Sequence, residues 1–96
     1  MHVLALAVEL HLPDCRSLKA KRSVLKPITE GARRRFGVAV AETDHQNTWQ
    51  RASVGVAAVG ATASHVQDVI DEVERFIWSF PTVHVLSTTR SWMEID

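Results

Sequence analysis

Four stretches of the chain alternate apolar and polar residues, and two stretches between them repeat apolar residues at helical spacing. The alternating stretches are residues 2–12, 38–44, 49–61 and 83–95, and the helical ones are residues 17–35 and 64–80. A period of two is typical of a strand with one covered face, whereas a period near 3.6 is typical of an amphipathic helix. The order of these six stretches constrains the fold more than any other feature of the sequence.

This order predicts an α+β fold. Two split βαβ units of this length form a ferredoxin-like βαββαβ sandwich, in which a four-stranded antiparallel sheet carries both helices on one face. Right-handed crossovers place the first and third strands at the centre of the sheet. The 96 residues suffice for one modest core, so we expect residues 1–96 to form a single domain.

Local signals mark the ends of the two helices. Ser17 is suited to cap the start of the first helix, and Gly37 to end it in a left-handed conformation. Pro27 cannot donate a backbone hydrogen bond, so a kink or break is expected near residues 24–26. Residues 64–67 resemble a capping box that opens the second helix.

The sequence indicates a cytoplasmic protein. No apolar run approaches the ~20 residues that span a bilayer. Residues 1–4 contain no basic segment and no small-residue cleavage site, so no signal peptide is expected. Cys15 is the only cysteine, which excludes an internal disulfide and suits a reducing compartment.

Positive charge is concentrated in the first helix. Eight of the eleven Lys and Arg residues lie between Arg16 and Arg35, together with a single acid, Glu30. This segment has a formal charge of about +7, although the whole chain has a net charge of 0. At ~100° per residue, four of the cations form a stripe beside the apolar one. They are Lys19, Arg22, Lys26 and Arg33.

A stripe of cations along a helix is typical of phosphate binding, so we expect a non-enzymatic protein that binds RNA. Alternatively, the helix is solvated and balanced by acids of the second helix, in the same molecule or in another copy. Lys21 projects near the apolar edge, where it either snorkels or pairs with a carboxylate. Trp49 either contacts a partner or covers the edge of the core. The residues expected to contact RNA are Arg16, Lys19, Lys21, Arg22, Lys26, Arg33, Arg34, Arg35, Trp49 and Arg51.

The sheet face without helices is expected to carry small residues, among them Ala5, Ala7, Ala41 and Gly55. RNA-recognition domains of this topology stack bases on aromatic residues of the central strands. Such aromatic residues are missing here, so the sheet is not expected to stack bases. This face either contacts a second copy to form a homodimer or is simply solvated.

Other functions have weaker support. The five histidines and Cys15 show no metal-ligand spacing, so neither a metal nor a cofactor is expected. A hydrolase with Cys15 as nucleophile and His45 as base is one alternative. However, residues 12–16 lack the glycine-rich phosphate loop of acylphosphatases, which share this size and topology. A regulatory or oligomerisation module that binds no nucleic acid is the other alternative.

Three segments together resemble the YlxP-like family of small bacterial proteins of unknown function. They are residues 17–26 (SLKAKRSVLK), 40–45 (VAETDH) and 49–57 (WQRASVGVA). The resemblance covers nearly the whole chain and implies a ferredoxin-like fold. Genes of this family often lie near those for translation initiation and ribosome maturation, which implies binding to ribosomal RNA or a pre-ribosomal particle. The resemblance implies no catalytic residues.

Overall fold

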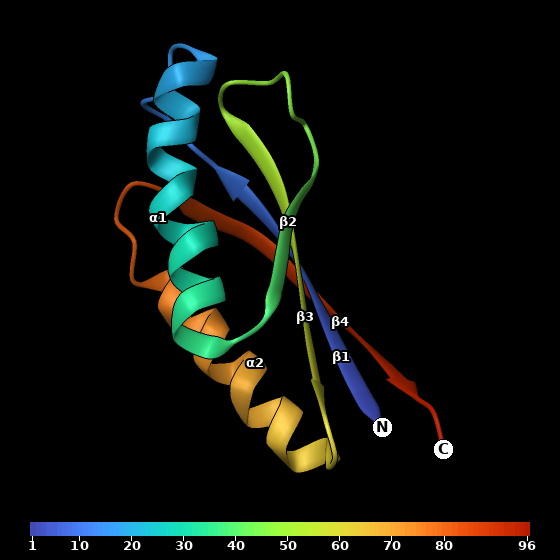
Figure 1. Ribbon diagram of the computed structural model, residues 1–96. Helices are drawn as coiled ribbons and strands as arrows, with labels where there is room; N and C mark the ends of the chain where they lie inside the picture. Colours follow the sequence, from blue (N-terminus) through green and yellow to red (C-terminus); the bar gives the residue numbers. More distant parts are fainter.

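The computed structural model describes all residues from Met1 to Asp96 and contains four strands and two helices. The elements are β1 (His2–His11), α1 (Leu18–Phe36), β2 (Ala39–Asp44), β3 (Arg51–Gly60), α2 (Ala63–Trp78) and β4 (His84–Glu94). The strands lie in the order β2-β3-β1-β4, and all neighbouring pairs are antiparallel. The predicted ferredoxin-like fold is therefore confirmed, with β1 and β3 at the centre of the sheet (Figure 1).

Both helices cover the same face of the sheet, and the core lies between these two layers (Figure 1). The alternation of β1 buries Leu4, Leu6 and Val8 on this face, while α2 contributes Val66 and Ile70. The burial of these apolar side chains is the main stabilising contribution to the fold. Neither helix has the length and apolar character needed to cross a membrane.

The opposite face of the sheet is lined by small side chains, as the sequence predicted. Ala5 lies between Ala57 and Ser91 on the neighbouring strands, and Ala7 lies between Gly55 and Thr89. β2 continues these two rows at its own alanines, residues 39 and 41. A shallow, mostly apolar hollow of about 460 Å³ lies over the rows. We call this surface the open face.

The first helix has the predicted ends, and of the kink or break expected near residues 24–26 it shows no break. Ser17 caps the start, because its side-chain oxygen accepts a hydrogen bond from the backbone N–H of Ala20 at 3.0 Å. Gly37 ends the helix in the left-handed region, with φ +64°. The helix runs unbroken through Pro27. Pro27 and Ser23 are both exposed, so the ring and the carbonyl that loses its partner lie on the solvent side.

Two other boundaries differ from the sequence-based prediction. The second helix begins at Ala63, because Thr62 rather than Ser64 is the capping residue and accepts a hydrogen bond from His65 N–H at 3.3 Å. The third strand begins at Arg51 rather than at Trp49. Trp49 therefore belongs to the loop that joins β2 to β3, where its side chain is not constrained to either face of the sheet.

Replacing Gly37 tests the left-handed end of the first helix. A β-carbon added at this position would meet no atom within 4 Å, so the only cost of Gly37→Ala is the positive φ. We expect the free energy of unfolding to fall by about 1 kcal/mol in urea denaturation, and by less for Gly37→Asn. An alanine variant as stable as the original protein would contradict this conformation.

Candidate nucleic-acid interface

One side of the first helix carries the exposed cations that the sequence placed on a stripe. Leu25, Ile28 and Ala32 are buried on the side that packs against the rest of the molecule. Seven of the cations between residues 16 and 35 are exposed. Five of them, including one that precedes the helix, form no ion pair and contact no aromatic ring. These residues, which we call the basic face, are Arg16, Lys19, Arg22, Lys26 and Arg33.

The basic face is not neutralised within the molecule. Of the eight cations between residues 16 and 35, only Lys21 and Arg34 form ion pairs. Three of the four acids of α2 have other partners, since Asp71 and Glu74 pair with Arg90 of β4, and Glu72 pairs with an arginine of its own helix. The fourth, Asp68, pairs with no cation of α1. The second helix therefore does not balance the charge of the first in this molecule. A row of unpaired cations is electrostatically unfavourable unless an anion binds there.

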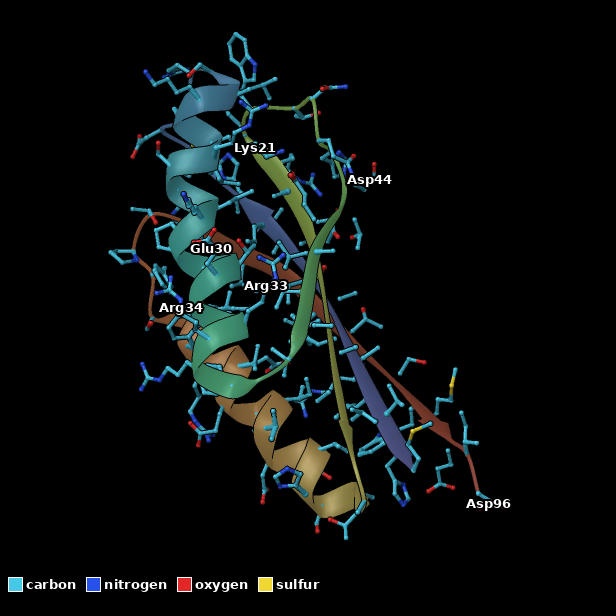
Figure 2. All side chains as sticks on the ribbon, viewed as in Figure 1. Lys21, Glu30, Arg33, Arg34, Asp44 and Asp96 are labelled. Atoms are coloured by element: carbon cyan, nitrogen blue, oxygen red, sulfur yellow. The ribbon has the colours of Figure 1, made fainter.

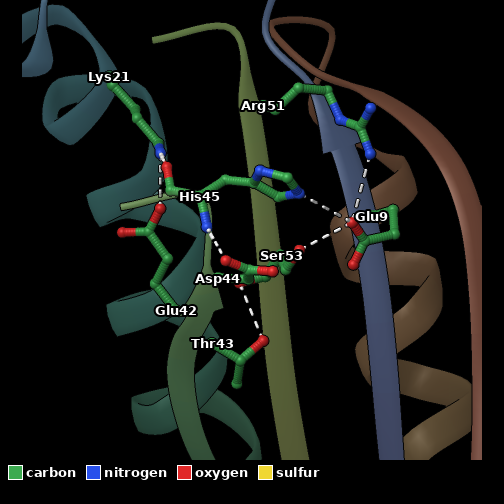
Figure 3. Close-up of polar contacts among 8 residues, drawn as sticks. All are labelled: Glu9, Lys21, Glu42, Thr43, Asp44, His45, Arg51 and Ser53. Atoms are coloured by element: carbon green, nitrogen blue, oxygen red, sulfur yellow. Dashed lines mark hydrogen bonds and ion pairs between the residues drawn. The ribbon is translucent and has the colours of Figure 1, made fainter. Parts of the chain in front are cut away.

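Lys21 was among the residues expected to contact RNA, but its side chain is buried, with only 2% of its surface exposed. Its ammonium group lies 2.7 Å from Oε2 of Glu42 on β2, and donates to the carbonyl oxygen of His45 at 2.5 Å (Figure 3). The sequence left two alternatives for Lys21, which were snorkelling to solvent or pairing with a carboxylate. The structure shows the pair with a carboxylate. A buried amine held in this way joins α1 to β2 and positions the loop that follows β2.

The three arginines of the last helical turn have different surroundings. Arg33 donates to the carbonyl oxygen of Val40 at 2.5 Å, and points toward β2 (Figure 2). Arg34 lies 3.7 Å from Glu30, and both residues line a separate hollow together with Lys26. Arg35 lies over the rings of Phe36 and Phe76, 5.6 and 5.7 Å from their centroids. Of these three arginines, only Arg33 lines the groove between α1 and the β2–β3 connection.

A groove of about 500 Å³ lies between α1 and the β2–β3 connection. The α1 wall contains the cations Arg22, Lys26 and Arg33, together with one acid, Glu30, which pairs with Arg34. The Lys21–Glu42 pair contributes to its lining, and Gln46 and Asn47 of the loop also line it. Cations that converge on a polar groove provide both charge and hydrogen-bonding groups for an anionic ligand. We call this feature the basic groove.

The loop over the basic groove is held in place by several hydrogen bonds. His45 has φ +63°, and its backbone N–H donates to the Asp44 carboxylate at 2.7 Å. The carbonyl oxygen of His45 also accepts from the Thr48 N–H at 3.0 Å. At the far end of the loop, the Gln50 side chain donates to the carbonyl oxygens of Pro13 and Cys15. The loop is thus attached to α1 at one end and to the β1–α1 connection at the other.

Trp49 is an exposed side chain rather than a cover over the core. The residue is 49% exposed. It lines a second hollow of about 450 Å³ together with Arg16, Asn47, Thr48 and Gln50. Asn47 also lines the basic groove, so the two depressions adjoin. The structure therefore brings Trp49 close to the N-terminal end of the basic face.

Arg51 lies on a different surface from the basic face. Its guanidinium group lies 3.4 Å from Oε1 of Glu9, which also accepts a hydrogen bond from the Ser53 hydroxyl at 2.7 Å. His45 Nε2 lies 3.9 Å from the same carboxylate oxygen (Figure 3). These residues form a polar cluster at one end of the open face. Arg51 therefore does not join the other cations in the basic groove.

The environment of Cys15 runs against the alternative of a thiol nucleophile. The residue is buried, and this burial, together with the nearby charge of Asp14, raises the pKa of the thiol. A catalytic thiol requires the opposite shift. His, Cys, Asp and Glu side chains nowhere gather in groups of three that would hold a metal ion.

The sequence did not assign Gln46 and Asn47 to the site. Both belong to the polar turn between two predicted strands, so their presence in a loop was expected. Their place opposite the cations depends on how α1 packs beside β2, which is a long-range contact. The pairing of Lys21 with Glu42 could not be predicted for the same reason. The position of Lys21 near the apolar edge of the helix did indicate that this lysine could have a carboxylate partner.

Replacing the buried pair tests its role in positioning the loop. Lys21→Met leaves Glu42 Oε2, a buried oxygen that accepts no other hydrogen bond, without its ammonium partner. We expect a loss of about 2 kcal/mol in urea denaturation, less than for a fully buried pair because Glu42 is partly exposed. The double variant Lys21→Met/Glu42→Leu should recover much of this loss. Additive losses in the double variant would show that the two residues are not coupled.

Comparison with known proteins places this chain in a family. Residues 3–90 match the family described as "Protein of unknown function (DUF503)". The uncharacterized protein YlxP of Bacillus subtilis (strain 168) is 39% identical over 79 residues, covering 82% of this chain and 86% of that protein. The solution structure of the de novo designed protein LFR1 1, which has a ferredoxin fold, superimposes with a TM-score of 0.56 at 11% identity. That comparison covers 100% of this chain and 89% of the designed one, and it bears on the fold alone. Because the family match spans nearly the whole chain, this protein belongs to the DUF503 family, the YlxP-like proteins of unknown function.

Proposed function

We propose that this protein is a non-enzymatic, cytoplasmic RNA-binding protein whose basic face holds the phosphates of the RNA. The observation that carries the proposal is a row of five exposed cations with no ion-pair partner in the molecule. Three of these cations, Arg22, Lys26 and Arg33, also line the basic groove. Phosphates that bind in this row would relieve the repulsion among its charges and release counterions.

The length of the row favours a polymer over a small anion. Arg16 and Arg33 are separated by roughly 25 Å at the rise of an α-helix. A single phosphate or mononucleotide would neutralise only part of this length, whereas a nucleic-acid strand offers a phosphate at every nucleotide. The setting implied by the YlxP-like resemblance favours RNA over DNA, with a pre-ribosomal particle as the partner.

The open face supports a second candidate function, which is assembly into a homodimer. Its two central rows consist mainly of alanine and glycine, and are flanked by Val3, Val59 and Met93, which share the same side of the strands. Val59 and Met93 are both more than half exposed. Small side chains allow another sheet to approach closely, and exposed apolar residues gain free energy when a partner covers them.

Removing charge from the basic face tests RNA binding. The triple variant Lys19→Gln/Arg22→Gln/Lys26→Gln changes only exposed side chains that form no ion pair. We expect the slope of log affinity against log salt to become shallower by about 2 to 3, because each phosphate contact contributes nearly one unit. Fluorescence anisotropy with labelled RNA between ~50 and ~200 mM salt measures this slope.

The matched control is a pair of single variants, one on each helix. Arg22→Gln should weaken binding, whereas Arg75→Gln, an exposed arginine of α2, should leave the affinity unchanged. Equal effects of the two substitutions, or an unchanged slope in the triple variant, would exclude the basic face as the RNA contact.

A charge at the centre of the open face tests the homodimer. Ala7 is exposed between Gly55 and Thr89, so Ala7→Glu should leave the monomer folded while burying a charge in any sheet-to-sheet contact. We expect sedimentation to show a dimer for the original protein without RNA, and a monomer for this variant. Gln67→Glu, which adds the same charge on the exposed side of α2, should remain dimeric. A monomeric original protein at all accessible concentrations would rule out this assembly.

A further inference from the structure

We infer that the basic groove takes single-stranded RNA, and that one base stacks on Trp49. This inference rests on the proposed RNA-binding function and specifies the form of the RNA. The inference follows from how the two depressions adjoin on the surface. Asn47 lines both the basic groove and the adjoining hollow, and that hollow also contains Arg16 and Trp49. Phosphates on the cations and a base on the indole would belong to one continuous strand.

The indole is presented by a loop that needs little further ordering. On one side, the Thr48 N–H donates to the His45 carbonyl oxygen, which is also held by the buried Lys21. On the other side, the carbonyl oxygen of Gln50 accepts from the Leu12 N–H at 3.0 Å. Both neighbours of Trp49 are therefore anchored while its ring remains half exposed. A stacking surface fixed before binding loses less conformational entropy when a base arrives.

The amides that line the groove also fit a strand with unpaired bases. The side chains of Gln46 and Asn47 line the groove that also contains Arg22, Lys26 and Arg33. An amide offers both donors and an acceptor, which match base edges and the ribose 2′-hydroxyl. In a duplex the base faces are stacked on one another, so the indole would find no base to stack on, although the amides could still reach 2′-hydroxyls in the minor groove. The indole is thus the group of this site that only a single strand or a loop can use.

The other exposed tryptophans differ from Trp49 in their surroundings. Trp78 is 61% exposed, but the cations of its hollow, Arg75 and Arg90, are both paired with acids of α2, so the hollow offers no unpaired cation. Trp92 is exposed on the edge strand β4, and it lies opposite Leu4 on β1 rather than near the groove. Of the three tryptophans, Trp49 is the one that shares a hollow with an unpaired cation, Arg16. Trp78 therefore serves as a matched control.

The test compares Trp49→Ala with Trp78→Ala in binding to a labelled single-stranded RNA of about ten nucleotides, and to a duplex of the same sequence. We expect the original protein to prefer the single strand. Trp49→Ala should lower the affinity for it roughly 5- to 100-fold without changing the salt slope, because a stacking contact and no phosphate contact is lost. Trp49→Phe should retain most of the affinity, and Trp78→Ala should retain all of it.

A second measurement does not depend on removing Trp49. In the variant Trp78→Phe/Trp92→Phe, Trp49 is the only tryptophan, and its fluorescence should be quenched when the single strand binds. Salt-dependent binding without quenching, equal or tighter binding of the duplex, or full affinity in Trp49→Ala would overturn the single-strand inference while leaving the proposed function in place. Absence of any salt-dependent RNA binding would overturn both.

Discussion

The buried contact between Lys21 and Glu42 determines how the candidate site is built. It is the only ion pair that joins α1 to the sheet, and the same ammonium group also binds the carbonyl oxygen of His45. Removing two charges from water is costly, and the attraction between them repays this cost only when the geometry is good and further hydrogen bonds are made. The contact is therefore better understood as a positional constraint than as a source of net stability. It fixes the distance between the cationic wall of the groove and the loop that carries Gln46, Asn47 and Trp49.

The distribution of ion pairs explains why a neutral chain can present a cationic surface. Arg90 of β4 forms ion pairs with two of the four acids of α2, and Arg75 forms an ion pair with a third. Burial disfavours the charged form of Arg90, but the hydrogen bonds that it donates to the carboxylates of Asp71 and Glu74 outweigh this effect and raise its pKa. The acidic helix is thus largely satisfied by its own neighbours, and the basic helix keeps its excess charge. This separation costs self-repulsion along α1, which is the physical reason to look for a polyanionic ligand there.

Periodicity was sufficient to predict the order of the elements and the face of each central strand, and the capping residues Ser17 and Gly37 predicted the ends of α1, because all of these depend on local sequence. The predictions that failed depended instead on how segments distant in the sequence pack against one another. A break at Pro27 was expected because the sequence does not show that its missing hydrogen bond would fall on the solvent side. Arg51 was grouped with the other cations because its charge was visible, whereas its Glu9 partner is 42 residues away in sequence. Lys21 was correctly placed near the apolar edge, but Glu42 as its partner depends on the packing of β2 against α1. Contacts between distant segments thus determine which cations remain free, and composition cannot show this.

The two candidate surfaces lie on opposite layers of the sandwich. The basic groove is formed by α1 and the β2–β3 connection, whereas the open face is the side of the sheet that the helices leave uncovered (Figure 1). A dimer formed through the open face would therefore leave both basic grooves in solvent, on opposite sides of the assembly. Two grooves on one particle would bind two strands, or two segments of one folded RNA, more tightly than a single groove, because the second contact becomes intramolecular. The proposed assembly and the proposed RNA binding are thus compatible with each other, because each would depend on a different set of side chains.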